Sequence, residues 1–570
     1  MAEGAPAVEV DNEKENVQRP LNCNVGVLGH VDSGKTSLAR ALSTMGSTAS
    51  FDKHPQSKER GITLDLGFSA FLADVPEHIA RQSPEYSHLQ FTLVDCPGHA
   101  SLIRTVIGGA QIIDMMILVI DLTKGIQTQT AECLVIGELT AEHMIVVLNK
   151  LDLLPEAGRE EKLERMKKGI RKALGQTKFK DAPMVALAAR PFAEGAAEAD
   201  LGSQPPLPPM GLEALVAEMR AAVRLPERHG EGPLHFAIDH CFPIKGQGTV
   251  CTGTILRGSL AVNETIEFPE LRVDRKVKSI QMFKRPVQRA TQGDRVGVCV
   301  TQLNAEQLER GIACSPGSML TWTCAVIAVR PIRFYKGISR TGAKFHLTVG
   351  HTTVMAKATF FGLPKDQPDP QAEDAEAPAA KAPTAAVSMA QDLTDAFDAG
   401  ADYAYQDELR RDAGLRQWAV LELEHPVTSI VGALLIASHL EADVNANSCR
   451  LAFYGRMLQT ADASDPQAMA KLRVFKRKCK TGQVDRVQDA NTVIGRNLFN
   501  ATTDVNLFVG MKVNLGDLEG TIASSFGKAK FKVDFRHDLD LKAFQDAIRG
   551  KQIELRYRRY IFDTAKRMVQ

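Results

Sequence analysis

A glycine-rich segment, "GHVDSGKT" at residues 29–36, constrains the fold of this chain more than any other feature. The apolar stretch "CNVGVLG" leads into it, and "TSLARALS" after it has helical character. Gly29 and Gly34 allow a backbone loop to wrap closely around phosphate oxygens, and the loop amides and the helix N-terminus attract the anion. We therefore expect a strand–loop–helix unit that cradles phosphates, with Lys35 at the β- and γ-phosphates.

Two motifs are expected to complete a magnesium site beside this loop. In "DCPG", Asp95 ends an apolar run and is expected to hold a Mg²⁺-bound water, while the Gly98 amide senses the γ-phosphate. Thr36 and, from "ERGIT", Thr63 are expected to supply hydroxyl ligands. Because Thr63 can bind only while the γ-phosphate is present, its segment is expected to switch between order and disorder.

A separate motif, "NKLD" at 149–152, predicts which base is bound. Asn149 can bond the purine edge, and the Lys150 stem can lie over the ring. Asp152 accepts from N1–H and from the exocyclic amine of guanine, a donor pair that adenine lacks. Backbone contact with guanine O6 is expected around Ala188 and Ala189, so the site should prefer GTP to ATP. The full set predicted to bind GTP or GDP is Asp32, Ser33, Gly34, Lys35, Thr36, Ser37, Gly98, Asn149, Lys150, Asp152, Ala188 and Ala189.

His99 follows the γ-phosphate-sensing glycine directly. It should therefore lie beside the path of a water that attacks the γ-phosphate. Because phosphoryl transfer depends mainly on positioning and charge stabilisation, an imidazole at this place can orient that water. We expect His99 to be the catalytic residue of a GTPase.

The pattern of apolar segments predicts a multidomain protein of 570 residues. A disordered tail (1–21) precedes an α/β P-loop domain (22–227), in which buried strands alternate with amphipathic segments, as in a parallel sheet with helices on both faces. Short alternating strands then predict two β-barrel domains (228–320 and 321–462). The second barrel is interrupted by an acidic, Ala/Pro-rich segment at 363–404, which we expect to be a flexible insertion.

The last block, residues 463–570, is β-rich and basic, although the whole chain has a net charge of only +1. Residues 471–570 hold 21 Lys and Arg against 11 Asp and Glu. The N-terminus has no apolar signal core, and no run of about 18 apolar residues occurs, so we expect no membrane segment. The ten cysteines form no CxxC pair, which argues against a zinc knuckle, and we expect most of them to be small core residues in a reducing compartment. We expect a cytoplasmic monomer, with a nuclear pool left open.

Together, "GHVDSGKT", "ERGIT", "DCPGH" and "DLTKGIQTQTAE" resemble the translational GTPases of the elongation factor Tu class. The resemblance extends through "GQGTVCTGTILRG" in the first barrel and "AKFHLTVGHTTVMA" in the second. It implies a carrier of aminoacyl-tRNA whose docking on the ribosome moves His99 into place. It also implies that Val31 and Ile62 form an apolar gate in front of His99, although both could be plain core residues.

Two positions depart from the common carriers of this class. His240 in "DHCF" replaces an acidic residue, and Arg295 in "GDRVG" replaces a neutral one. Both add positive charge to the barrel face that should meet the aminoacyl end. A selenol is far more acidic than a serine hydroxyl, so a selenocysteine side chain is anionic and can accept charge-assisted hydrogen bonds. Asp239 could take the free α-ammonium group; alternatively, Arg295 only anchors a turn and His240 only fills a gap.

The basic C-terminal block has no counterpart in elongation factor Tu, and the whole arrangement resembles the eukaryotic selenocysteine-specific elongation factors. Its basic residues alternate with aromatic ones, as in "RVFKRKCK" and "LRYRRYIF", a composition that suits RNA binding. The resemblance implies delivery of selenocysteinyl-tRNA to the ribosome at recoded UGA codons. It also implies that this block couples to the selenocysteine insertion element of the mRNA and its binding protein.

Three other classes remain as alternatives. The first is an initiation factor 2 gamma-like carrier, against which the missing CxxC pair and the basic block argue. The second is a GTPase subunit associated with ATP sulfurylase, which has no use for a basic RNA-binding block. The third is a binding protein with an inactive nucleotide site, against which the intact Lys35, Thr36, Thr63, Asp95 and His99 argue.

Overall fold

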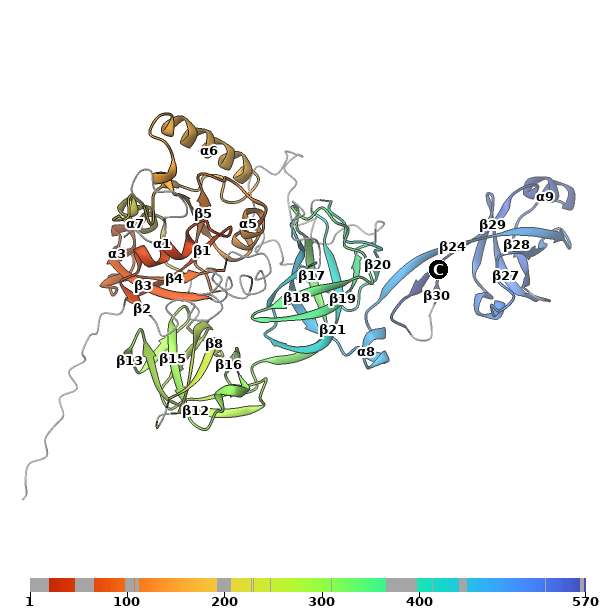
Figure 1. The fold of residues 1–570 in the computed structure, drawn as a ribbon. Helices are drawn as coiled ribbons and strands as arrows, with labels where there is room; N and C mark the ends of the chain where they lie inside the picture. Colours follow the sequence, from red (N-terminus) through yellow and green to blue (C-terminus); the bar gives the residue numbers. More distant parts are fainter. Residues whose placement is uncertain are drawn as a thin grey trace, which may run out of the picture.

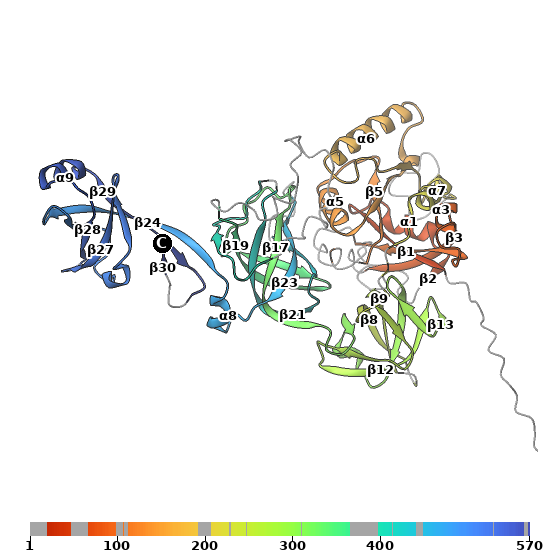
Figure 2. The same ribbon diagram turned by 180° about the vertical axis from the view of Figure 1, so that it is seen from behind.

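The computed structural model describes residues 20–46, 66–97, 107, 112–191, 207–226, 228, 230–244, 246, 248–308, 310–364, 397–412, 414–439, 449–527, 529–563 and 568–570. They form an α/β domain (domain 1, up to residue 226), two β-barrels (domain 2, 234–315, and domain 3, 320–461) and a smaller β domain (domain 4, 466–570). Domains 1 to 3 contact one another, whereas domain 4 extends from domain 3 alone (Figure 1). The view from behind shows the same arrangement (Figure 2).

Domain 1 is a seven-stranded sheet between helices. Its strands lie in the order β2 (Met45–Gly46), β3 (Gly67–Asp74), β4 (His88–Asp95), β1 (Leu21–Gly29), β5 (Met115–Asp121), β6 (His143–Asn149) and β7 (Met184–Ala186). The helices are α1 (Lys35–Leu42), α3 (Glu77–Ala80), α5 (Thr128–Thr140), α6 (Arg159–Leu174) and α7 (Leu212–Ala222). Apolar clusters cover both faces of the sheet, which explains why the central strands are apolar throughout.

The sequence pattern predicts a parallel sheet, but the observed sheet is mixed. Strands β4, β1, β5, β6 and β7 run parallel to one another, but β3 is antiparallel to β4 and β2 is antiparallel to β3. Strands β3 and β4 are joined by a connection without a crossover, so they run in opposite directions. The predicted tail is also one residue too long, because Leu21 already begins β1.

Domain 2 is a closed barrel. Its main sheet has the order β11 (Thr265–Phe268), β16 (Gly311–Cys314), β8 (His235–Ile244), β9 (Gly248–Arg257), β15 (Arg295–Val300), β12 (Val273–Met282) and β13 (Arg285–Val287). Pairing of β11 with β12 closes the barrel, and β10 (Ser259–Ala261) pairs with β14 (Arg289–Thr291) beside it. Closure leaves few free strand edges and surrounds one apolar core.

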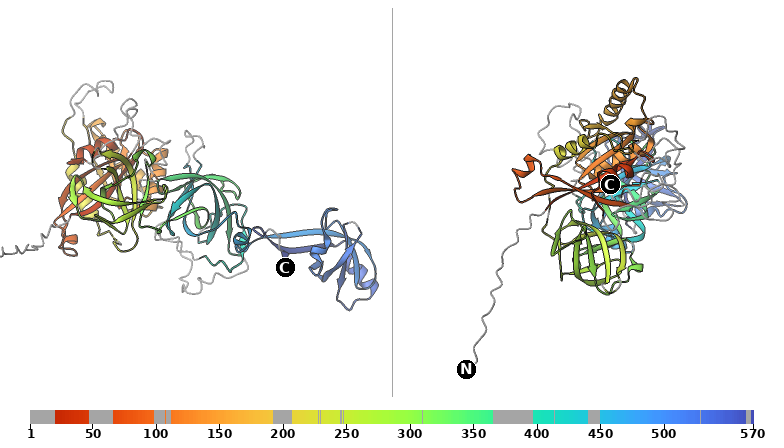
Figure 3. Two further views of the ribbon diagram at one scale, coloured as in Figure 1. Left: turned by 90° about the horizontal axis from the view of Figure 1, so that it is seen from below. Right: turned by 60° about the vertical axis from the view of Figure 1, so that its left-hand side comes forward.

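Domains 3 and 4 share one continuous sheet. The strands of domain 3 are β17 (Leu320–Pro331), β18 (Lys344–Val349), β19 (Thr352–Gly362), β20 (Tyr403–Tyr405), β21 (Gln417–Ser429), β22 (Leu434–Ser438) and β23 (Leu451–Thr460). After α8 (Pro466–Ala470), domain 4 adds β24 (Val474–Val487), β25 (Thr492–Arg496), β26 (Lys512–Leu515), β27 (Leu518–Phe526), β28 (Lys530–Phe535), α9 (Leu541–Ile548), β29 (Gln552–Tyr560) and β30 (Met568–Val569). The parallel pair β20–β24 joins them, and Figure 3 shows the long β24 as the stem of domain 4.

The predicted insertion at 363–404 overlaps this junction at its C-terminal end. Phe397 and Tyr403 pack against Trp418 and Phe361, with ring centroids 5.0–6.4 Å apart. The residues from 397 to 404 therefore belong to the fold, whereas 365–396 lie outside the described residues. The prediction of a flexible insertion was wrong for residues 397–404, because a short aromatic segment follows directly after the low-complexity one.

Polar contacts hold domain 1 against domain 3. Buried Glu132 on α5 accepts from Arg450, which precedes β23, with 2.9 Å from Nε to Oε1 and from Nη2 to Oε2. Arg333 donates to both oxygens of Glu138. None of the helices in the described ranges is both long enough and apolar enough to cross a lipid bilayer.

Candidate functional site

The phosphate loop runs from the end of β1 to the start of α1. Gly34 adopts φ 91°, and a Cβ atom added there would lie 2.1 Å from Asn149 Nδ2. A Cβ on Gly29 would lie 2.3 Å from the carbonyl oxygen of Val119. Only glycine fits both positions, which brings the backbone close to its neighbours as phosphate binding requires.

Lys35 of the loop and Asp95 at the end of β4 are both buried. Lys35 Nζ donates to the carbonyl oxygen of His30 at 2.7 Å, and Thr36 Oγ1 donates to Asp95 Oδ2 at 2.7 Å. Burial lowers the pKa of the Lys35 ammonium, a cost that a bound phosphate would offset. Within the described residues, Oγ of the buried Ser33 has no hydrogen-bond partner, so this loop has a donor directed at no protein atom.

These residues fit a nucleotide with Mg²⁺. A cation, a spare hydroxyl and a glycine-lined loop stand at a helix N-terminus, and a hydroxyl and a carboxylate, both ligand types that Mg²⁺ prefers, are in contact beside them. Asp32 is exposed with φ 58°, and Ser37 lies half-buried in the first turn of α1.

The residues predicted to bind the base converge on the phosphate loop. Asn149, the last residue of β6, donates from Nδ2 to the carbonyl oxygen of Ser33 at 2.8 Å and accepts at Oδ1 from the Ala189 amide at 3.1 Å. Ala188 and Ala189 are buried, and Asp152 lies half-buried in a 3₁₀ turn that begins at Leu151. One side chain therefore fixes the phosphate loop relative to both base-binding segments.

Sequence reasoning missed Asp121, the last residue of β5. Its Oδ2 lies 2.7 Å from Lys150 Nζ, and Lys150 has the left-handed φ of 67°. Burial opposes ionisation of Asp121, but hydrogen bonds from Lys150 and Thr123 hold its pKa below the usual value. The available signal was an acidic residue at the end of an apolar run, since the next apolar run along the chain ends in "NKLD".

Four predicted residues lie outside the described ranges: Ile62, Thr63, Gly98 and His99. The catalytic assignment, the second magnesium hydroxyl and one half of the gate therefore remain predictions. Val31, the other half of the gate, is half-buried, and its amide donates to Gln129 Oε1 at 3.4 Å.

In domain 2 the structure pairs two of the three residues predicted to recognise the cargo. Arg295 Nη1 lies 2.5 Å from Asp239 Oδ2, and both side chains are about 5% exposed. The guanidinium also stacks on Phe68 of domain 1, with 3.1 Å from Cζ to the ring centroid. On the other side, His351 Nε2 of domain 3 lies 3.7 Å from Asp239 Oδ1. Sequence reasoning assigned no role to Phe68 or His351, because contacts between domains leave no local pattern.

A cavity of about 100 Å³ lies beside this pair, lined among others by Arg295, Phe242, Thr252 and Cys299. His240 is not among its lining residues, but it pairs in register with Thr252 across β8 and β9. Cross-strand partners point to the same face of a sheet, so His240 shares the face of the cavity. The structure thus brings Asp239 and Arg295 into contact and leaves His240 next to them.

The basic residues of domain 4 gather on β24 and β29. Register partners there carry like charges, with Lys476 opposite Arg559 and Arg477 opposite Arg558. Successive register pairs alternate between the faces of a sheet, so each face carries one like-charged pair, and Arg558 also lies 3.5 Å from Asp402. Opposed cations destabilise an isolated sheet, so each pair favours an anionic neighbour. Aromatic rings accompany the cations, since Lys476 Nζ lies 3.5 Å from the ring centroid of Tyr405.

Four family profiles match the chain. "Elongation factor Tu GTP binding domain" matches residues 21–243, and "Elongation factor Tu domain 2" matches 248–314. "Selenocysteine-specific elongation factor, eukaryotes, 3rd domain" matches 326–455, and "eEFSec C-terminal RIFT domain" matches 470–551. The selenocysteine-specific elongation factor of Mus musculus is 45% identical over 607 aligned residues, which span 97% of this chain and 99% of the mouse protein.

This chain belongs to the selenocysteine-specific elongation factors. It is a GTPase of translation elongation. This membership excludes the three alternative classes considered from the sequence. The selenocysteine-specific elongation factor of Methanocaldococcus jannaschii is 35% identical over 347 residues, which span 60% of this chain and 67% of that protein.

The architecture recurs in solved selenocysteine-specific elongation factors. Translation elongation factor SelB from Methanococcus maripaludis, in complex with the GTP analogue GppNHp, superimposes with a TM-score of 0.65 at 24% identity. That comparison covers 95% of this chain and 99% of the other, and the apo form of the same protein gives 0.64. At this identity the likeness establishes the fold: a P-loop GTPase domain followed by β-barrels.

Proposed function

We propose that this elongation factor binds selenocysteinyl-tRNA while loaded with GTP and Mg²⁺, and releases it on the ribosome at recoded UGA codons after hydrolysis to GDP. The observation that carries the proposal is the buried Arg295–Asp239 ion pair beside a small cavity in domain 2. We further propose that the factor acts as a cytoplasmic monomer.

The ion pair supports selection by exchange of partners. A selenocysteinyl ester carries a selenolate and an α-ammonium group. The selenolate can replace Asp239 at the guanidinium, and the ammonium can take the released carboxylate, so every charge keeps a partner. A seryl ester supplies only the ammonium and would leave the Arg295 cation without an anion in a buried site. His240, on the same face, offers a second donor to the selenolate.

The cavity volume agrees with a small side chain. A cavity of about 100 Å³ can admit a group of side-chain size but is well below the volume of small-molecule sites. Its lining combines apolar Phe242 with the Thr252 hydroxyl and the guanidinium, which suits a polarisable anion on a short stem.

In domain 1 we assign the nucleotide chemistry to the residues that the motifs predict. Thr36, Thr63 and Asp95 would hold Mg²⁺, which supplies charge neutralisation at the β- and γ-phosphates when bound. His99 would orient the attacking water. Val31 and Ile62 would keep His99 away from that water until the ribosome is engaged.

Domain 4 is proposed to contact RNA or an RNA-bound protein, specifically the selenocysteine insertion element of the mRNA and its binding protein. The like-charged register pairs on β24 and β29 support this, because an RNA backbone would supply negative charge beyond that of Asp402, which pairs with Arg558. Aromatic residues beside the cations would add stacking with bases.

The decisive experiment compares protection of the aminoacyl ester against hydrolysis, with selenocysteine or serine on the same tRNA body and GTP present. We expect the selenocysteinyl ester to bind at least about tenfold more tightly, which corresponds to ~1.4 kcal/mol. Arg295→Gln should remove this preference, while Arg285→Gln, an exposed arginine of the same barrel, should retain it. Equal protection of both esters by the unaltered protein would refute the cargo assignment and leave the GTPase assignment intact.

The catalytic assignment has its own test. His99→Ala should bind GTP almost normally and lose hydrolysis stimulated by ribosomes. If stimulated turnover survives this change, another group orients the water.

A further inference from the structure

A second, much larger cavity lies where domains 1, 2 and 3 meet, with a volume of about 820 Å³. Domain 1 contributes the amino ends of β1, β5 and β6, including Asn24, Asp114 and His143. The phosphate loop begins at Gly29, at the opposite end of β1, so this cavity is separate from the nucleotide site. Its volume lies in the range of small-molecule sites.

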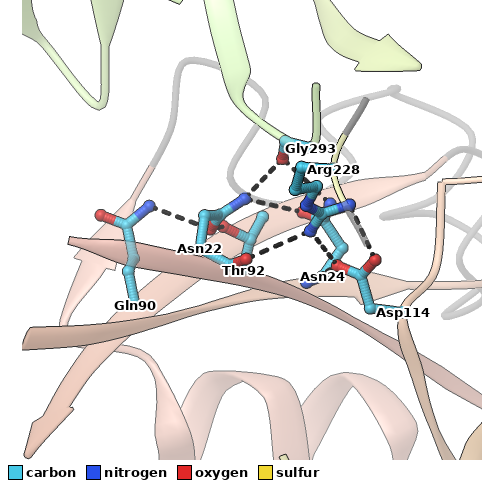
Figure 4. A network of polar contacts seen from close by, with 7 residues as sticks. All are labelled: Asn22, Asn24, Gln90, Thr92, Asp114, Arg228 and Gly293. Carbon is cyan, nitrogen blue, oxygen red and sulfur yellow. Dashed lines mark hydrogen bonds and ion pairs between the residues drawn. The ribbon is translucent and has the colours of Figure 1, made fainter. Parts of the chain in front are cut away.

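One wall of this cavity is a fixed polar network (Figure 4). Arg228 donates from Nη1 and Nη2 to the two oxygens of Asp114, at 3.0 and 2.7 Å. Asn22 and Asn24 both donate to the carbonyl oxygen of Gly293 in domain 2, at 2.6 and 3.0 Å. These bonds fix the position of domain 2 against domain 1, so the wall is already formed without a ligand.

The rest of the lining holds three more arginines against one more carboxylate. Arg224, Arg257 and Arg456 line the cavity from the C-terminus of α7, from β9 and from β23, respectively. Among the described residues, none of the three has a carboxylate within ion-pair distance. The two carboxylates of the lining are Asp114, already paired with Arg228, and Glu142, which is exposed, as are Arg224 and Arg257.

Burial also shifts the pKa values of Arg456 and His235 in the lining. Arg456 is half-buried, donates Nη1 to the carbonyl oxygen of Gly432 at 3.0 Å, and burial lowers the pKa of its guanidinium. Burial, with His351 and Arg257 nearby, lowers the pKa of His235 to about 4, so this imidazole adds a neutral donor or acceptor. A partly buried cation without an anion is costly, so an anionic ligand would offset the cost at Arg456 and would also pair with the exposed Arg224 and Arg257.

We propose that this junction cavity binds a compact, phosphate-bearing polyanion of small-molecule size. Guanidinium groups match phosphate oxygens in two-point hydrogen bonds, and three arginines from three separate parts of the chain line this one cavity. Because domain 2 supplies Arg257 and domain 3 supplies Arg456, the ligand bridges both barrels. It therefore stabilises the domain arrangement seen here relative to any arrangement that separates the two arginines.

The test uses the full-length protein loaded with GDP and Mg²⁺, so that the nucleotide site is filled. Sodium tripolyphosphate is titrated calorimetrically, with matched free Mg²⁺ in cell and syringe. We expect saturable binding of one tripolyphosphate per chain. The double variant R257Q/R456Q should bind at least tenfold more weakly. The control R165Q, on the exposed face of α6, should bind like the unaltered protein.

Retained GDP affinity and an unchanged thermal transition will show that the double variant is folded. Absence of saturable binding to the unaltered protein would overturn the proposal, as would equal affinity of R257Q/R456Q and R165Q. A short single-stranded RNA with a 5′-triphosphate forms a separate arm. If that RNA binds in an arginine-dependent way and tripolyphosphate does not, the cavity receives the end of a polymer and the small-molecule proposal is wrong.

Discussion

The ion pair between Glu132 and Arg450 offers a measurable test of how domain 1 supports domain 3. Both side chains are at most 5% exposed, and the backbone amide of Arg450 adds a third bond to Oε1 at 3.1 Å. Arg450→Met removes the two guanidinium bonds and keeps the amide bond, so the Glu132 carboxylate stays buried with one donor. Breaking a buried pair from one side costs 3–5 kcal/mol, and the remaining bond favours the lower end, ~3 kcal/mol.

The assay is urea unfolding of the full-length, GDP-bound protein followed by tryptophan fluorescence. The chain has only two tryptophans, Trp322 and Trp418, and both lie in domain 3, so the signal reports the domain that loses the contact. Arg450→Met should lower the free energy of unfolding reported there by ~3 kcal/mol, about 150-fold in the equilibrium constant. Arg410→Met, which breaks an exposed pair in the same domain, should stay within ~0.5 kcal/mol.

A further result separates this reasoning from a general packing defect. The double variant E132L/R450M removes both charges and should recover most of the loss. With both charges gone, the deficit relative to Arg410→Met should be small. If the single and double variants lose the same free energy, the buried carboxylate is not the cause.

Three other changes test the nucleotide site and the junction of domains 3 and 4. Gly34→Ala places a Cβ against Asn149, and we expect GDP affinity, measured with a fluorescent analogue, to fall at least tenfold while domain 3 unfolds normally. Asp152→Asn should lower GTP affinity about 100-fold and favour xanthosine triphosphate in competition binding, because an amide donor matches a ring carbonyl. Asp402 accepts from the Tyr560 hydroxyl at 3.0 Å, and Asp402→Ala should speed hydrogen exchange in β20 and β24 without altering GDP binding.

The convergence of the nucleotide motifs could be predicted from the sequence. Ser33, Asn149 and Ala189 lie far apart in the chain, yet each follows or lies near the end of an apolar run. Parallel strands bring their carboxyl ends to one edge of a sheet, so side chains at those ends must meet. The hydrogen bonds of Asn149 with Ser33 and Ala189 show that these segments do meet at that edge.

The direction of β3 and the junction at β20 could not be predicted in the same way. A strand buried on both faces has the same composition whether it runs parallel or antiparallel, and the connection to its neighbour decides the direction. For β20, only three residues long, the preceding low-complexity segment dominated the composition. Its aromatic side chains have partners on β19 and β21, and no local pattern identifies those.

The cargo residues illustrate a third limit. The sequence assigned Asp239 and Arg295 separately, one to the ammonium and one to the selenolate, because 56 residues separate them in the chain. In the structure they neutralise each other, and Phe68 and His351 contact the pair from domains 1 and 3. Partner exchange at this pair would therefore disturb contacts with both neighbouring domains.

The stacking of Phe68 on Arg295 connects the cargo site to domain 1. Phe68 lies on β3, directly after the segment that contains Thr63, whose contact with Mg²⁺ we expect to depend on the γ-phosphate. If the position of β3 differs between nucleotide states, the stacking of Phe68 on Arg295 differs too, and so does the cost of turning the guanidinium toward a selenolate. Linkage then requires the reverse effect: cargo that holds Arg295 must change the affinity for GTP relative to GDP by the same factor. An Arg295 variant should weaken this coupling even where it still binds the tRNA body.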